Sequence, residues 1–159
     1  MSTAAIQPAT MNRRFFAFML DGLALGAIAL FVVANIVFAG DTSTDAFARV
    51  AILSLIELGY FVLTWTQLGA SPFQWLLRMR TLNAADGALV TPSQALRRWA
   101  FLYGPNWLLS VLALLPGAGS AGFLVIVYWY YLYRTASRDP QKRGFHDHQS
   151  GTIVVRSTT

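Results

Sequence analysis

Four long apolar stretches, separated by polar segments, dominate the pattern of the chain. A helix needs about 20 mainly apolar residues, and at least about 17, to cross the hydrocarbon core of a bilayer. The pattern therefore predicts an all-α integral membrane protein with four transmembrane helices. The last two stretches are short, and they form either two short spans or a hairpin that does not fully cross. The predicted spans are residues 14–38, 47–68, 97–115 and 119–135.

Basic residues lie almost entirely on one side of these spans. The chain contains 12 Lys and Arg residues, and all but Arg49 lie before or at the start of the first span, at or after the end of the fourth, or between the second span and the start of the third. Cytoplasmic loops of membrane proteins are enriched in Lys and Arg. The distribution predicts that both termini are cytoplasmic (N-in/C-in), with a cytoplasmic loop at residues 69–96 and a cytoplasmic C-terminal segment at 136–159.

The composition agrees with a membrane protein. Only 12% of the 159 residues are charged and 55% are apolar, whereas soluble domains are about 25% charged. The net charge of +5 needs no nucleic-acid partner, because basic side chains at a membrane surface bind anionic lipid headgroups. The chain has no cysteine, which excludes disulfides, Fe–S clusters and thiol catalysis. The predicted headgroup contacts are Arg97, Arg98, Arg138, Lys142 and Arg143.

The cytoplasmic segments contain short runs with β-strand character. The pair Asp86-Gly87 favours a tight hairpin turn, and β-branched residues favour strands. We predict a small cytoplasmic β-hairpin or three-stranded element that ties the C-terminus to the central loop, with irregular loops as the alternative. The predicted strands are Leu77–Leu82, Ala88–Val90 and Thr152–Val155.

The N-terminal region allows two interpretations. Residues 1–11 are predicted to be a disordered tail. Arg13 and Arg14 before an apolar run are also typical of a signal peptide. The run is longer than the usual signal core of about 7–15 residues, and it contains Asp21. We therefore expect a retained first span.

Two acidic residues, Asp21 and Glu57, fall inside predicted spans. An ionisable side chain at the bilayer centre costs at least about 2.5–3.5 kcal/mol, so each needs a partner. Asp21 follows Arg14 by about two helical turns, which places both on nearly the same helix face. A pair between them either fixes the helix structurally or keeps a protonatable carboxylate in an ion path.

A polar cluster is predicted where the spans reach similar depth. Pro105 cannot donate a backbone hydrogen bond, which frees the carbonyl of Phe101. Oxygen ligands of this kind suit a small cation or a proton. A second interpretation is that these groups only hold the four helices together by hydrogen bonds. The predicted cluster is Asp21, Glu57, Asn106 and Phe101.

Gly22 and Gly26 form a small-xxx-small pattern that permits close helix packing, within the chain or between two copies. His146 and His148 have no third ligand nearby in the sequence, so no metal site is predicted. No cofactor and no catalytic residue are predicted either.

Asp147 lies between these two histidines. We expect its carboxylate to bond backbone N–H groups or to pair with Arg80 or Arg97, which would dock the C-terminal strand.

Several motifs resemble the RDD family of prokaryotic integral membrane proteins, which is named for one arginine and two aspartates. Arg14, Asp21 and Asp147 match these three positions, and the resemblance covers residues 12–157. It implies a multi-pass protein of the prokaryotic inner (plasma) membrane. One departure is Phe73-Gln74, where the family often has Gly-Lys. Further similar segments are Gly69–Pro72, Leu76–Leu77, Arg80, Asp86–Gly87, Phe145–Asp147 and Gly151–Val155.

The resemblance leaves two functions open. Some family members are linked to sodium/proton antiport. Four short helices leave little room for an alternating-access pathway without oligomerisation, and inverted repeats are not evident. We therefore expect a non-enzymatic accessory or scaffold component that acts through lipid and helix contacts, with a membrane-protein partner or as a homo-oligomer. The alternative is an ion-coupled transporter that uses Asp21 and Glu57.

Overall fold

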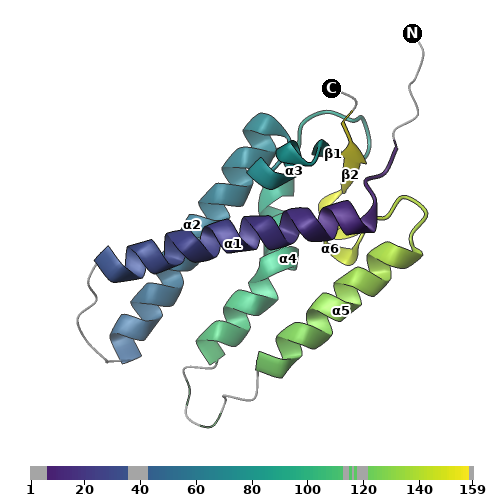
Figure 1. Cartoon of the computed structure of the whole chain (residues 1–159). Helices are drawn as coiled ribbons and strands as arrows, with labels where there is room; N and C mark the ends of the chain where they lie inside the picture. Colours follow the sequence, from purple (N-terminus) through teal and green to yellow (C-terminus); the bar gives the residue numbers. More distant parts are fainter. Residues whose placement is uncertain (1–6, 36–42, 113–114, 116, 118–121, 158–159) are drawn as a thin grey trace.

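The computed structural model describes residues 7–35, 43–112, 115, 117 and 122–157. The fold is mostly helical, with one small antiparallel sheet (Figure 1). Helices α2, α4 and α5 lie beside one another, α1 crosses α2, and α3, α6 and the sheet gather at one end. The elements are α1 (Met11–Asn35), α2 (Ser43–Leu68), α3 (Pro72–Leu76), β1 (Met79–Asn83), α4 (Pro92–Leu112), α5 (Gly122–Arg138), α6 (Phe145–Ser150) and β2 (Thr152–Arg156).

Each of the four apolar stretches coincides with a long helix, but within the described ranges two of these helices are long and apolar enough to cross a membrane. These are Met11–Val33 in α1 and Ala46–Leu68 in α2, each 23 residues long. Only 17% and 6% of the residues in their most apolar windows are buried inside the protein. Large apolar side chains such as Leu30 and Leu63 are instead exposed. Because water disfavours extended apolar patches, these faces indicate a protein that associates with a membrane.

The sheet joins the central loop to the C-terminus, as predicted. β1 pairs antiparallel with β2, with Thr81 opposite Val154. The predicted third strand, Ala88–Val90, is wrong, because that segment contributes only one isolated bridge between Leu82 and Leu89. This segment lies between the turn at residues 84–87 and the start of α4 at Pro92, so too few residues remain for a ladder.

The N-terminal residues that the structure describes are ordered on the sheet, so the predicted tail at 1–11 is wrong from residue 7 onward. The N–H of Ala9 donates to the carbonyl of Val154 at 3.0 Å, and the N–H of Arg156 donates to the carbonyl of Gln7 at 2.9 Å. Met11 already opens α1. The rest of the predicted tail, residues 1–6, lies outside the described part of the chain.

An aromatic core fills the space between α2 and α4 close to the sheet. Phe61, Trp65 and Tyr103 are buried there. The rings of Phe61 and Tyr103 stack with centroids 4.7 Å apart, and such a pair contributes about 0.5–1.5 kcal/mol beyond its buried area. This core holds α2 and α4 firmly at the end of the molecule where the polar side chains meet.

The two glycines of the small-xxx-small pattern are not packed against a helix of the same chain. A Cβ atom added to Gly22 or Gly26 would meet nothing within 4 Å among the described residues. Close packing within this part of the chain is therefore not their role. Packing between two copies stays a prediction.

Candidate functional site

Asp147 is buried in the short helix α6, at the centre of a polar network. The chain before the helix is extended at Gly144, whose N–H donates to Asp147 Oδ2 at 2.9 Å. The chain after the helix turns at Gly151, with φ of 65°, a left-handed conformation that glycine adopts without strain. The N–H bond from Gly144 and the left-handed turn at Gly151 bracket this six-residue helix, which carries Asp147 into the interior.

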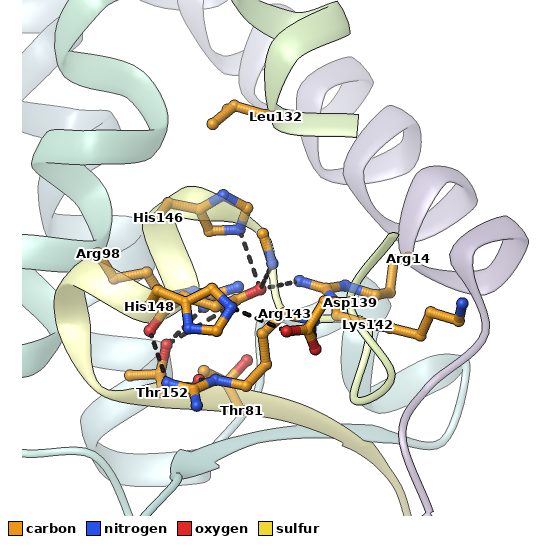
Figure 2. A network of polar contacts seen from close by, with 12 residues as sticks. Arg14, Thr81, Arg98, Leu132, Asp139, Lys142, Arg143, His146, His148 and Thr152 are labelled. Atoms are coloured by element: carbon orange, nitrogen blue, oxygen red, sulfur yellow. Dashed lines mark hydrogen bonds and ion pairs between the residues drawn. The ribbon is translucent and has the colours of Figure 1, made fainter. Parts of the chain in front are cut away.

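Two arginines from distant helices neutralise this carboxylate. Arg14 Nη2 in α1 lies 2.5 Å from Asp147 Oδ2, and Arg98 Nη1 in α4 pairs with Asp147 Oδ1. Arg98 also donates to Thr152 Oγ1 at 2.7 Å. Figure 2 shows Arg14 and Arg98 reaching the network from opposite sides, with His146 above it. The network therefore joins α1, α4, α6 and β2.

The expected partners of these charges were partly wrong. Arg14 binds Asp147 and not Asp21, and Asp147 binds neither Arg80 nor Arg97. Successive residues of a helix point about 100° apart. Arg98 therefore faces inward while its neighbour Arg97 is exposed. Arg98 is consequently unavailable to lipid headgroups, contrary to the prediction.

The electrostatics of Asp147 follow from these contacts. Burial alone would raise the pKa of this carboxyl group, but the guanidinium groups of Arg14 and Arg98 more than offset that effect. They hold the pKa of Asp147 well below its usual value of 3.8. The carboxylate thus stays ionised at neutral pH and keeps both ion pairs.

Asp21 belongs to a second, separate contact between helices. Its Oδ1 accepts a hydrogen bond from the Tyr60 hydroxyl at 2.6 Å, and its Oδ2 accepts one from the Ser71 hydroxyl at 2.5 Å. Asp21 is buried and links α1 to α2 and to the start of α3. Neither partner could be predicted from local spacing, because the two lie 39 and 50 residues from Asp21.

Gln74, at a position where the sequence departs from the family pattern, supports this contact. Its side-chain oxygen accepts hydrogen bonds from the N–H of Ser71 at 3.0 Å, from Trp65 Nε1 at 3.2 Å and from Thr81 Oγ1 at 3.1 Å. Ser71 and Gln74 form a capping box on α3. The Ser-Pro-x-Gln spacing is a signal that predicts such a cap from sequence.

The comparison with protein families supports the assignment that these residues suggest. The family model described as the RDD family matches residues 8–151. The chain belongs to the RDD family. No curated protein matches the chain. No solved structure matches it either. In this RDD protein, Arg14 and Asp147 pair directly, and Asp21 lies in the neighbouring contact.

The residues of the predicted intramembrane polar cluster of this RDD protein do not all lie together. Glu57 and Asn106 line one cavity of about 270 Å³, whereas Asp21 lines a different cavity of about 470 Å³. The carbonyl of Phe101 is not free, because it accepts a hydrogen bond from the Tyr128 hydroxyl. The prediction that all four residues meet was therefore wrong.

The other basic residues that were predicted to contact lipid headgroups differ in how exposed their side chains are. Arg97 and Arg138 are exposed. Lys142 Nζ donates to the carbonyl of Ser137 at 3.1 Å, and Arg143 Nε donates to the carbonyl of Thr152 at 3.0 Å. Both are half-buried. Contacts of these side chains with lipid stay a prediction.

The two histidines beside Asp147 differ in their surroundings. His148 is exposed and pairs with Asp139 at 3.0 Å. His146 is buried, and its Nε2 lies 3.5 Å from Asp147 Oδ2. Within the described ranges, no group of three His, Cys, Asp or Glu residues is placed to hold a metal ion.

Proposed function

We propose that this RDD protein crosses the prokaryotic cell membrane four times, with both termini in the cytoplasm. Its basic residues support this topology. All Lys and Arg residues except Arg49 belong to helix ends, loops and strands at the end of the molecule that carries the sheet (Figure 1). Cytoplasmic surfaces of membrane proteins have this enrichment. The Arg14–Asp147 pair also requires the start of α1 and the C-terminal segment to be on one side.

We propose further that the protein is a non-catalytic accessory component that binds another membrane protein. One observation carries this proposal. The charged residues of the family motif are occupied by internal contacts: Asp147 by two guanidinium groups, and Asp21 by two hydroxyl groups. Groups used in this way hold the helices and the sheet in place. The exposed apolar side chains of α1, such as Leu23 and Leu30, then remain for contact with a partner.

A photo-crosslinking experiment in the native membrane tests the accessory function. A photoreactive phenylalanine at Leu30, whose side chain is 74% exposed, should give an adduct of one discrete mass above that of the protein. The same group at Leu55, which is exposed on α2, is the matched control for nonspecific reaction. If Leu30 gives only lipid adducts or the same pattern as Leu55, the accessory proposal is wrong.

A second function, ion-coupled transport, is favoured by one specific observation. The cavity of about 270 Å³ brings Glu57 together with Asn106, Ser54 and Ser110, from α2 and α4. A carboxylate, an amide and two hydroxyl groups inside a bundle of apolar helices are groups that an ion or proton pathway uses. Cation-dependent proton flux in proteoliposomes tests this alternative.

A further inference from the structure

A cavity of about 470 Å³ lies beside the ion-pair network, bounded by α1, α2, α4, α5 and α6. This volume falls in the range of about 300–1,000 Å³ that small-molecule sites occupy. Most of its wall is apolar and aromatic, with Phe18, Leu102 and Trp129 among the lining residues. Arg98 and His146 also line it. A cavity of this kind fits a molecule with a long apolar part and a small polar head.

The opposite part of the lining faces outward. Phe15 on α1 and Ile126 and Tyr130 on α5 line the cavity, and each is exposed over more than half of its surface. In a bilayer, exposed apolar side chains of this kind contact acyl chains. The cavity therefore opens sideways, between α1 and α5, toward lipid.

His146 contributes a hydrogen-bond acceptor. Burial lowers the pKa of His146 to about 3, despite the opposing effect of the Asp147 carboxylate, so its ring is neutral at pH 7. An ionised carboxylate only accepts hydrogen bonds, so the ring proton belongs on Nε2, which faces Asp147 at 3.5 Å. Nδ1 is then an acceptor. It is buried, has no hydrogen-bond partner among the described residues, and points toward Leu132 (Figure 2).

Arg98 contributes a donor. Its Nη1 is occupied by Asp147 and Thr152, and its guanidinium carbon lies 5.0 Å from the centre of the Trp65 ring. Its Nε–H is buried and, in the part of the chain that the structure describes, also lacks a hydrogen-bond partner. A buried polar group without a partner is unfavourable. A ligand that supplies both missing bonds would remove this cost.

The charges around the cavity balance. Arg14 and Arg98 contribute two positive charges, Asp147 pairs with both guanidinium groups, and the carboxyl group of Asp21 also lines the cavity. A phosphate or ammonium head would bring an uncompensated charge into this buried environment, which is costly. A hydroxyl group carries no charge, donates to Nδ1 and accepts from Nε–H. The site therefore favours an uncharged, hydroxyl-bearing head over a phospholipid head.

We propose that this cavity binds an acylglycerol, with its glycerol hydroxyl groups hydrogen-bonded to His146 Nδ1 and Arg98 Nε and its acyl chain leaving between α1 and α5. The apolar wall receives the first part of the acyl chain, and the bilayer receives the rest. The proposal goes beyond the accessory function and does not depend on it.

Tryptophan fluorescence tests this proposal, because Trp65 and Trp129 line the cavity. The full chain is reconstituted into phosphatidylcholine nanodiscs and titrated with a monoacylglycerol that carries a brominated acyl chain, a quencher of tryptophan. We expect saturable quenching, whereas brominated phosphatidylcholine gives only gradual quenching. Trp129→Phe should reduce the saturable part. The matched variant Trp75→Phe, at an exposed residue outside the cavity lining, should leave it unchanged.

Two comparisons test the head group. The methyl ester of the same brominated fatty acid has no hydroxyl group and should bind about tenfold more weakly, as expected for the loss of a buried hydrogen bond. His146→Gln should weaken binding of the monoacylglycerol by about the same factor. The glutamine amide nitrogen replaces Nε2 beside Asp147 but leaves no acceptor at the position of Nδ1.

Three results would overturn the proposal. The first is the absence of saturable quenching in the wild-type protein. The second is equal saturable quenching by brominated phosphatidylcholine, which would assign the cavity to bulk lipid. The third is equal affinity for the monoacylglycerol and the methyl ester. This last comparison uses the wild-type chain, so it decides the question even if His146→Gln does not fold.

Discussion

Arg14 and Asp147 form an ion pair of 2.5 Å although 133 residues separate them in the chain. The arginine lies near the start of α1, and the aspartate lies in α6 just before the last strand. These two residues were predicted to match the arginine and the second aspartate of the family motif. Their contact joins the two ends of the chain, and Arg98 completes it from α4. These ion pairs thus hold the start of α1, α4 and α6 together at the end of the molecule that carries the sheet.

Asp147→Asn should destabilise the protein strongly. The substitution removes a buried negative charge and leaves the guanidinium groups of Arg14 and Arg98 uncompensated. Loss of one partner of a buried ion pair costs about 3–5 kcal/mol. Thermal unfolding in detergent, followed by circular dichroism, measures the change. Asp139→Asn is the control, because this carboxylate pairs with the exposed His148 and such a pair contributes at most about 1 kcal/mol. Equal stability of the two variants would contradict a structural role of the network.

The approximate positions of the four long helices could be predicted from the sequence, but those of the short helices α3 and α6 and the partners of the charged residues could not. Apolar stretches about 20 residues long identify helices by a local property. The spacing of Arg14 and Asp21 also suggested a local pair, yet the true partner of Arg14 comes from the opposite end of the chain. The partner of Asp21 is likewise distant, since Ser71 follows it by 50 residues. Spacing within one helix does not indicate which distant segment supplies the partner of a charged residue.

The sheet illustrates the same limit. The β-branched run at Thr152–Val155 correctly indicated β2, because strand preference is partly local. The ordering of Gln7 and Ala9 on that strand was missed. These two residues have no apolar alternation, and backbone hydrogen bonds to an existing strand edge hold them in place. Such bonds depend on the neighbouring strand and leave no pattern in the segment that pairs with it.

Acidification should destabilise the protein through His146. Burial lowers the pKa of His146 to about 3 in the folded state, from 6.5 when it is free. The unfolded chain therefore binds a proton below pH 6.5 that the folded protein does not bind. Its contribution to stability is present above pH 6.5 and is lost as the pH falls toward 3. One pH unit corresponds to about 1.4 kcal/mol, so about 2 kcal/mol should disappear between pH 6.5 and 5.

The paired variants of the two histidines measure this effect. His146→Gln should flatten the dependence of the unfolding free energy on pH between 6.5 and 5. His148→Gln, at the exposed neighbour of Asp147, should retain the wild-type slope. Chemical unfolding at a series of pH values gives both slopes. If the two variants change the slope equally, burial of His146 is not its source.

Tyr60→Phe should cost about 1–3 kcal/mol of unfolding free energy. The change removes the hydroxyl group that donates to Asp21 Oδ1 at 2.6 Å, and a buried acceptor without a donor carries a penalty of that size. Tyr133→Phe is the control, because Tyr133 is 52% exposed. Thermal unfolding of both variants under identical detergent conditions provides the comparison. A loss of unfolding free energy that is confined to Tyr133→Phe would contradict the assigned role of Asp21.

Cysteine labelling can test the four-span topology directly, because the chain has no native cysteine. We expect Ala85→Cys and Gln149→Cys, both at exposed positions on the sheet side, to react with a membrane-impermeant maleimide only after spheroplasts are permeabilised. Leu115→Cys, at an exposed residue beyond the end of α4, should react in intact spheroplasts. Reaction of Gln149→Cys before permeabilisation would place the C-terminal segment outside and contradict the proposed orientation.

Proton flux separates the accessory function from the transport alternative. Glu57 is the acidic residue of the cavity that also contains Asn106, so a transporter that uses this cavity should lose its flux in Glu57→Gln. The accessory function predicts no cation-dependent flux from the wild-type protein in proteoliposomes, with sodium, lithium or potassium. Asp86→Asn, at an exposed carboxylate in the turn after β1, is the matched control for loss of a negative charge. Flux that disappears in Glu57→Gln but persists in Asp86→Asn would assign transport to this cavity and overturn the accessory function. In a protein that only binds a partner, ion movement does not depend on the Glu57 carboxylate.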